Sequence, residues 1–149
     1  MSRKLNVGDY ACEFEDGYEV PVYFDRKSVP DLFGTIGKGY ERFKKEIMRA
    51  INSNVRLYII IEGSQTKVLK GPSQATKKII VAGKKKYVPL TAKEKLKRGV
   101  STVKTLNTLW LRYGVVPIYC VNREDMSRYI YEYYANIGEK RSKGIDVTL

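Results

Sequence analysis

Hydrophobic and polar positions along the chain predict short strands that alternate with amphipathic helices. Residues 20–28 alternate apolar and polar side chains with the period of two that a strand requires. Pro21 is tolerated only near the start of a strand, so this strand is expected to begin at residue 19 or 20. Ser28 and Pro30 then suit the cap and the first turn of a helix that opens with Asp31. The pattern therefore predicts a strand followed directly by a short helix.

Later segments carry apolar residues at helical spacing. The first covers residues 40–51 and is followed by a buried strand over 55–62. Thr91 and Glu94 form a capping box that predicts a short basic helix, and a separate helix is expected over 100–113, with Trp110 in the core. A strand over 115–121 comes next. Asn122 is expected to start the last helix, and residues 136–149 are expected to form a flexible tail.

Residues 64–98 form the most basic stretch, with eleven Lys or Arg and Glu94 as its one acid. Two apolar runs, 79–81 and 87–90, either form a hairpin across 82–86 or belong to a mobile loop that DNA would order. The residues suited to nucleic-acid contact, through phosphates or base stacking, are Lys84, Lys85, Lys86 and Tyr87. The stretch is therefore interpreted as a basic insertion, and the plain alternative is a solvated surface.

At 149 residues, with 43% hydrophobic residues, the chain is long enough to form one domain, residues 1–149, with its own core. No apolar run approaches the length of a membrane span, and the N-terminus lacks the apolar stretch of a secretory signal, so we expect a cytoplasmic protein without membrane contact. Cys12 and Cys120 are expected to be reduced thiols, and a bridge between them is the alternative.

The chain has no histidine, which excludes Ser-His triads, histidine-based phosphodiesterases and Cys-His zinc sites. Its formal net charge is +12, from 28 Lys and Arg against 16 Asp and Glu. Such a charge attracts polyanions and favours nucleic acid as the partner, although a merely soluble basic protein would share it. Any phosphodiester chemistry must then depend on carboxylates and lysine.

The candidate chemistry lies at the end of the first strand. Because side chains alternate along a strand, Asp25 and Lys27 should project from the same face. Asp9, about a hairpin earlier, supplies a second carboxylate. Mg²⁺ takes oxygen ligands and keeps several waters, so Asp9 and Asp25 can hold Mg²⁺ or Mn²⁺ and leave positions for a phosphate and a water. Lys27 can orient the attacking water and offset charge on the phosphate.

An acid, a spacer and then acid-x-Lys is the PD-(D/E)XK arrangement. The fuller pattern is Gly8-Asp9-Tyr10, then Asp25-Arg26-Lys27, three residues and Asp31. It resembles the GD and ERKxxxD motif of XPF-type nucleases, which include the archaeal Hef nuclease domain, and the likeness covers residues 7–63 with weaker agreement over 100–135. Asp25 stands where the family usually has Glu, and its shorter side chain must be met by a shift of the backbone or of the metal.

The resemblance implies a restriction-endonuclease-like α/β fold, with a mixed sheet flanked by helices. It also implies an enzyme that hydrolyses DNA at branches, flaps or junctions. It also implies that Arg26 and Asp31 brace the site or contact the DNA backbone, and that the domain forms a homodimer. Tyrosines 129, 131, 133 and 134 exceed what one core face needs, and their surplus fits an interface with another subunit or with DNA, of which the subunit is preferred. Family members usually carry a leading strand ahead of Gly-Asp, and only six residues precede Val7, so we expect that strand to be missing.

Glu62 ends the buried strand of residues 55–62 and precedes Gly63. Ligands gather at the carboxyl ends of strands in open α/β sheets, so Glu62 is a third candidate metal ligand, expected beside Asp25 and Lys27. A surface acid at a strand end is the plain alternative.

Two other functions stay open. A catalytically silent DNA-binding scaffold could use the same fold, although silent partners in this family usually lose the acid-x-Lys site that is present here. A sequence-specific restriction-type endonuclease would share the chemistry, and the positions of its cuts would distinguish it.

Overall fold

In the computed structural model, which describes residue 5 and residues 7–145, three parallel strands form the central sheet in the order β1-β2-β5. These strands are β1 (Val22–Ser28), β2 (Arg56–Glu62) and β5 (Val116–Cys120). An isolated antiparallel bridge between Tyr10 and Phe24 adds the N-terminal segment to the outer edge of β1. The expectation about a leading strand concerns residues 1–6, of which only Leu5 lies within the described residues.

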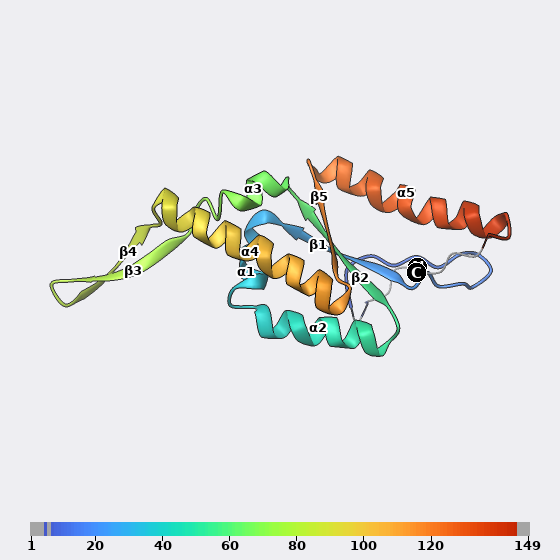
Figure 1. The fold of residues 1–149 in the computed structure, drawn as a ribbon, viewed down its shortest axis with the longest axis horizontal. Coiled ribbons are helices and arrows are strands. Elements are labelled where there is room, and N and C mark those ends of the chain that lie inside the picture. Colours follow the sequence, from blue (N-terminus) through green and yellow to red (C-terminus); the bar gives the residue numbers. More distant parts are fainter. Residues whose placement is uncertain (1–4, 6, 146–149) are drawn as a thin grey trace.

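Helices cover both faces of this sheet (Figure 1). One face carries α1 (Val29–Ile36), α2 (Tyr40–Asn52) and α4 (Ala92–Tyr113), and the other face carries α5 (Arg123–Ser142). A short helix, α3 (Gln65–Leu69), follows β2 and packs against α4. The result is a mixed α/β domain of the restriction-endonuclease-like kind, as predicted, although α4 is one helix where two were expected.

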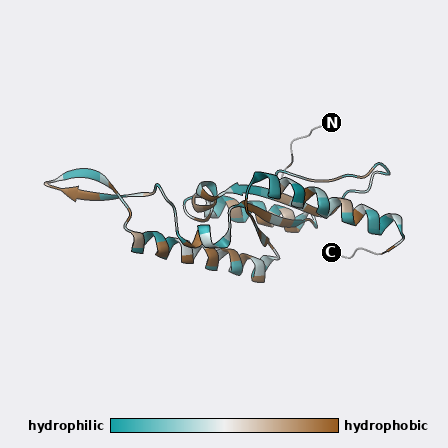
Figure 2. Cartoon of the chain, turned by 90° about the horizontal axis from the view of Figure 1, so that it is seen from above, coloured by the Kyte–Doolittle hydropathy of each residue, from teal (hydrophilic) through white to brown (hydrophobic). Residues whose placement is uncertain are grey.

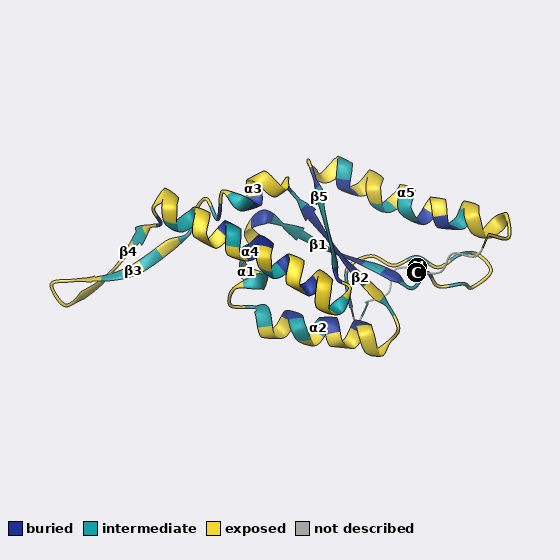
Figure 3. Cartoon of the chain, viewed as in Figure 1, coloured by how far each residue is buried: buried dark blue, intermediate teal, exposed yellow. Residues whose placement is uncertain are grey.

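Buried residues occupy much of the central strands and recur at intervals along the helices (Figure 3). The alternation of side chains along the strands divides this core into two clusters. Leu57, Ile59 and Ile61 of β2 face α1, α2 and α4. Tyr58 and Ile60 of β2 face α5 and pack with buried residues of β1, Val22 and Phe24. Consecutive residues of one strand point to opposite clusters. Even-numbered residues of β1 therefore face α5, and odd-numbered residues face α1, α2 and α4.

Helix α4 corrects the sequence-based interpretation, which placed two helices in its range. Thr91 caps it as predicted, because its hydroxyl accepts from the Glu94 amide and the Glu94 carboxylate accepts from the Thr91 amide. The helix then continues without a break through Gly99 to Tyr113. A Cβ atom at Gly99 would clash with the Leu69 carbonyl, so the glycine is required by the close crossing of α3 and α4 and not by a helix end.

Two other predictions about the helices were wrong in detail. Trp110 is 51% exposed, because the buried stripe of α4 runs through Val103, Leu106 and Leu109. Helix α5 continues to Ser142 and buries Ile137, so residues 136–142 are helical. Residues 146–149 of the predicted tail lie outside the described residues.

The tyrosines of α5 are largely used inside the domain. Tyr133 and Tyr134 contact Phe24 edge to face, with ring centroids 5.4 Å apart in each pair. The Tyr134 hydroxyl donates to the Val22 carbonyl at 2.6 Å, and its burial raises the pKa of Tyr134. Tyr131, at 74% exposed, stays outside this cluster. Most of the tyrosines that were expected to be surplus therefore serve the core and are not left over for an interface.

The basic stretch contains the predicted hairpin, formed by β3 (Thr76–Val81) and β4 (Lys84–Pro89). Ala82 and Gly83 alone form the turn, with positive φ angles of 52° and 75°, so Lys84, Lys85 and Lys86 lie in a strand and not in the loop expected for residues 82–86. The hairpin projects from the body of the domain (Figure 2).

Both cysteines are free thiols, as expected. Among the residues that the structure describes, no helix is long and apolar enough to cross a membrane.

Candidate active site

The Gly-Asp segment is held against the edge of β1. Gly8 has a positive φ of 69°, and a Cβ atom there would lie 3.1 Å from the Phe24 carbonyl oxygen, so this tight approach favours glycine. The Asp9 amide donates to the same carbonyl at 2.8 Å, and the Asp9 carboxylate accepts from the Arg26 amide at 2.8 Å. These bonds fix Asp9 beside the end of β1, as the spacing of the motif predicted.

Asp25 is the buried acid of the site, with 4% of its surface exposed. Its side chain points to the layer of α1 and α2, together with Lys27, and the Lys27 ammonium lies 3.5 Å from Asp25 Oδ2. That distance is long for a hydrogen bond, and Asp25 Oδ2 accepts none from the described residues. A buried carboxylate oxygen without a donor is unfavourable by roughly 1–3 kcal/mol or more, which is typical of a site that awaits a ligand.

Glu46 is a member of the site that the sequence analysis missed. It projects from α2, and its Oε1 accepts from the Gly8 amide at 2.9 Å. Its charge also acts on Asp25. Glu46 has no motif around it, and its position in an amphipathic helix is typical of a solvent-facing acid. Only the packing of α2 against the Gly-Asp segment brings it to the site.

The electrostatics of this cluster are dominated by its crowded negative charge. Burial, and then the charges of Glu46 and Asp9, raise the pKa of Asp25 to about 7, while Lys27 acts in the opposite direction. Three carboxylates and a single ammonium therefore converge at one edge of the sheet. With a pKa of about 7, the carboxyl group of Asp25 is mostly protonated below neutral pH and mostly charged above it when no cation is bound.

Three other predicted residues lie outside this cluster. Glu62 was expected beside Asp25 and Lys27, but it projects from the opposite face of the sheet, where its Oε2 lies 3.4 Å from Arg26 Nη2. Arg26 shares that face because it is adjacent to Asp25 in the strand. Asp31 is exposed in the first turn of α1, where its amide donates to the Ser28 hydroxyl at 3.2 Å, and its carboxylate is not among the groups that act on Asp25.

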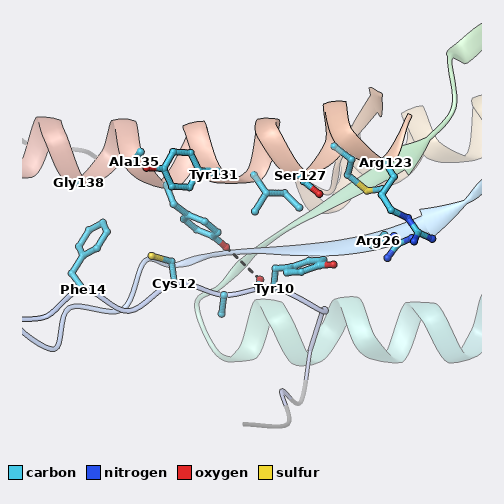
Figure 4. Close-up of a pocket in the computed structure, with 13 residues that line it drawn as sticks. Tyr10, Cys12, Phe14, Arg26, Arg123, Ser127, Tyr131, Ala135 and Gly138 are labelled. Atoms are coloured by element: carbon cyan, nitrogen blue, oxygen red, sulfur yellow. Dashed lines mark hydrogen bonds between the residues drawn. The ribbon is translucent and has the colours of Figure 1, made fainter. Parts of the chain in front are cut away.

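Arg26 instead borders a cavity of about 690 Å³ between residues 10–14 and α5 (Figure 4). Arg123 lines the same cavity, and Tyr10, Tyr131 and Tyr134 supply much of its aromatic wall. Contacts with Tyr10 and Glu62 raise the pKa of Arg26, which stays cationic. Arg26 thus lies on the face of the sheet that α5 covers, where it pairs with Glu62, although it is adjacent in sequence to Asp25 of the acidic cluster.

The acidic cluster fits a hard divalent cation. Its donors are all carboxylate oxygens, one of them buried without a partner, and a cation would relieve the repulsion among Asp9, Asp25 and Glu46. Within residues 5 and 7–145, no group of three or more acidic or cysteine side chains is arranged so that it could hold a metal ion. Magnesium commonly binds through one or two carboxylates and water, so a partial protein shell suits it.

The residues predicted to bind nucleic acid lie apart from the acidic cluster. Lys84, Lys85, Lys86 and Tyr87 are all on β4, in the projecting hairpin, and all are exposed. Their separation from Asp25 means that they cannot take part in the chemistry at the cluster.

Comparison with known protein families identifies a match over most of the chain. A family model, described as the ERCC4 domain, matches residues 1–133, which include every residue of the acidic cluster and the hairpin. No curated protein matches the chain. This family model covers most of the chain, and the match agrees with the Gly-Asp and acid-x-Lys motifs and with the observed fold. The chain therefore belongs to the ERCC4 domain family, which is the XPF-type nuclease domain.

Proposed function

We propose that this protein is a metal-dependent endonuclease that hydrolyses phosphodiester bonds of DNA. The observation that carries the proposal is the buried Asp25 carboxylate, which has an unpartnered oxygen and lies between Lys27 and the acids Asp9 and Glu46. A scaffold would gain nothing from this arrangement, because a buried and repelled carboxylate destabilises the fold.

Asp9 and Asp25 would hold Mg²⁺ or Mn²⁺. When bound, such an ion polarises a phosphate oxygen and lowers the pKa of a coordinated water. Lys27, whose side chain is 22% exposed, can orient the attacking water and offset the negative charge that grows on the phosphate. Glu46 positions the Gly-Asp segment through the Gly8 amide. Asp31, exposed at the start of α1, can contact the hydrated DNA backbone.

The substrate and the assembly follow from the family resemblance. XPF-type nucleases act on branched, flapped or junction DNA, and the net charge of +12 suits a polyanion. They also pair, so we propose a homodimer. Exposed apolar residues are present for such a contact, among them Trp110, Leu111 and Tyr131. Sedimentation at micromolar concentration would test the dimer, and a monomer throughout would oppose it.

The first test compares the wild-type protein with Lys27→Ala on an end-labelled DNA fork. In Mg²⁺ or Mn²⁺ the wild type should cleave the fork, and the variant should cleave about 100-fold more slowly, because loss of one group that stabilises charge in the transition state costs at least about that factor. Fork affinity in a gel shift should stay close to that of the wild type, since one charge of many is lost.

Lys143→Ala is the matched control. It removes the same charge from the end of α5, where Lys143 is paired with Glu139, and should cleave like the wild type. If the wild type leaves the fork intact in both metals but still shifts it, the silent scaffold is the better interpretation. Cuts that follow a base sequence and ignore the branch point would favour a restriction-type endonuclease.

Glu46 gives the site a pH dependence that can be tested separately. Because its charge raises the pKa of Asp25, Glu46→Gln should move the midpoint of metal binding to lower pH. Binding of Mn²⁺, followed by electron paramagnetic resonance between pH 5 and 9, measures that midpoint. Glu46→Asp keeps the charge and should stay nearer to the wild-type curve. A Glu46→Gln midpoint at or above the wild-type value would contradict the assignment.

A further inference from the structure

The β3–β4 hairpin has a regular composition across its two strands. Five successive cross-strand pairs each join one lysine to one apolar or aromatic residue. In order from the base to the tip, these pairs are Lys77 with Val88, Lys78 with Tyr87, Ile79 with Lys86, Ile80 with Lys85, and Val81 with Lys84. We call residues 76–89 the basic arm. A solvated surface hairpin has no need of apolar residues in every pair.

Three of the five apolar or aromatic side chains in these pairs are largely uncovered by the domain. Ile80 is 72% exposed, Tyr87 is 68% exposed and Val81 is 52% exposed. A two-stranded hairpin alone in water is marginally stable, and exposed apolar residues along it favour a partner that covers them. The arm is therefore built for contact along its length.

The charge of the arm identifies the kind of partner. Residues 76–89 hold five lysines and no acid. Lys77 is bound to the Glu94 carboxylate at 2.8 Å, which anchors the base of the arm to α4. The other four, Lys78, Lys84, Lys85 and Lys86, have no carboxylate partner among the described residues. A polyanion complements this surface, whereas an ordinary protein surface would leave four ammonium groups unmatched.

The lysines lie on both faces of the ribbon. Because side chains alternate along each strand, Lys78 and Lys85 point to one face, and Lys84 and Lys86 point to the other. A single strand of nucleic acid would engage one face, but the groove of a duplex has a phosphate backbone on each side. A two-stranded ribbon fits within such a groove, and six residues of strand extend about 20 Å along it.

A second basic surface connects the arm to the body of the domain. A cavity of about 860 Å³ is lined by α1, by residues 67–75 ahead of the arm and by α4. Four cations, Lys38, Lys67, Lys70 and Arg98, line it, and no carboxylate does among the described residues. Helix α1, which forms part of its wall, begins directly after Lys27 and Ser28 at the end of β1. The four cations therefore line the surface between α1 and the arm.

We propose that the basic arm lies in a groove of duplex DNA that flanks the scissile bond, with its lysines on the phosphates of both strands and its apolar side chains against the sugars. This inference rests on the proposed function, because it names the form of the DNA that the nuclease holds next to its site. The arm sets affinity and position, and the acidic cluster performs the chemistry.

The test measures how binding depends on salt. Neutralising a lysine that contacts a phosphate lowers the slope of log affinity against log salt by about 0.9 for a duplex. The triple variant Lys84→Gln, Lys85→Gln, Lys86→Gln should therefore lose about 2–3 from the slope on a duplex of roughly 30 base pairs and bind it at least about tenfold more weakly at about 100 mM KCl. The matched control replaces three exposed lysines elsewhere, Lys104, Lys140 and Lys143, by glutamine. It should keep most of the wild-type slope.

The possible outcomes separate the arm from the nuclease. Equal slopes for the two triple variants would overturn the role of the arm, while cleavage of the fork by the wild type would still support the proposed function. A reduced slope together with a wild type that fails to cleave would support the arm and reject the nuclease. A loss confined to single-stranded oligonucleotides would overturn the duplex groove in favour of base stacking on Tyr87. Circular dichroism of the variants shows that the fold is retained.

Discussion

Asp25→Asn is expected to reduce cleavage more than about 1,000-fold and, at the same time, to stabilise the metal-free protein at pH 8. Loss of cleavage follows because even the outer partners of a metal ligand change activity by about 10- to 100-fold, and Asp25 would be a ligand itself. Stabilisation follows because the amide keeps the shape of the side chain but removes a buried charge that Asp9 and Glu46 repel.

The pH dependence of this gain has a definite sign. The pKa of Asp25 is raised from 3.8 to about 7 by folding, so between these values the native state binds a proton that the unfolded state has released. The free energy of unfolding of the wild type therefore falls as pH rises from about 4 to about 7. The amide of the variant does not titrate, and one pKa unit corresponds to about 1.4 kcal/mol, so Asp25→Asn should gain up to about 4 kcal/mol at pH 8, or roughly 8–16 °C in Tm, and almost nothing at pH 4.

Thermal melts of both proteins at pH 4 and pH 8, with and without Mg²⁺, measure these effects. Mg²⁺ should raise the Tm of the wild type and leave that of Asp25→Asn unchanged, since only the native wild type binds the ion. Asp16→Asn is a control of opposite sign, because its ion pair with Arg141 lowers the pKa of Asp16. An Asp25→Asn protein that is less stable than the wild type at pH 8, or that cleaves at the wild-type rate, would contradict these roles of Asp25.

Gly99→Ala should lower the free energy of unfolding by about 2–4 kcal/mol, although alanine is the better helix former. The new Cβ atom would clash with the carbonyl groups of Leu69 and Val68, so α3 and α4 would have to separate. Val68 is fully buried, and its displacement would open the core beneath it. Urea unfolding followed by circular dichroism measures the loss.

Gly34→Ala is the matched control, because Gly34 is also helical but a Cβ atom there meets nothing within 4 Å. It should raise the stability by up to about 1 kcal/mol through the lower entropy of the unfolded chain. If the two alanine variants change stability in the same direction, the close crossing of α3 and α4 does not determine the role of Gly99.

Local chemistry allowed much of the fold to be predicted from the sequence. The Ser28 cap, the capping box at Thr91 and the alternation in β1 depend on neighbours within a few residues, and the structure contains all three. The prediction of two helices failed where α4 continues through Gly99, a residue whose role local chemistry does not reveal. Its true role is tertiary, since it admits the backbone of α3.

In the candidate site, too, the residues placed by local sequence were predicted and those placed by tertiary packing were not. The motif brought together Asp9, Asp25 and Lys27, because one strand and the segment bridged to its edge suffice to place them. Glu62 was assigned to the wrong face, because Ile59, Ile60 and Ile61 before it are all buried and show no alternation from which its direction could be read. Glu46 could not be found at all, since its place depends on how α2 packs against residues far from it in sequence.

The alternation of β1 has a consequence for how this protein can vary in length. Asp25 and Arg26 are neighbours that serve opposite layers, so lengthening β1 by one residue ahead of Asp25 would turn the guanidinium toward the acids and the carboxylate toward α5. Val22 and Phe24, both fully buried, hold the strand against such a slip. Insertions and deletions among relatives should therefore accumulate in the exposed bend around Asp16 and Gly17. They should avoid β1, because a change of register there would remove Asp25 from the acidic cluster.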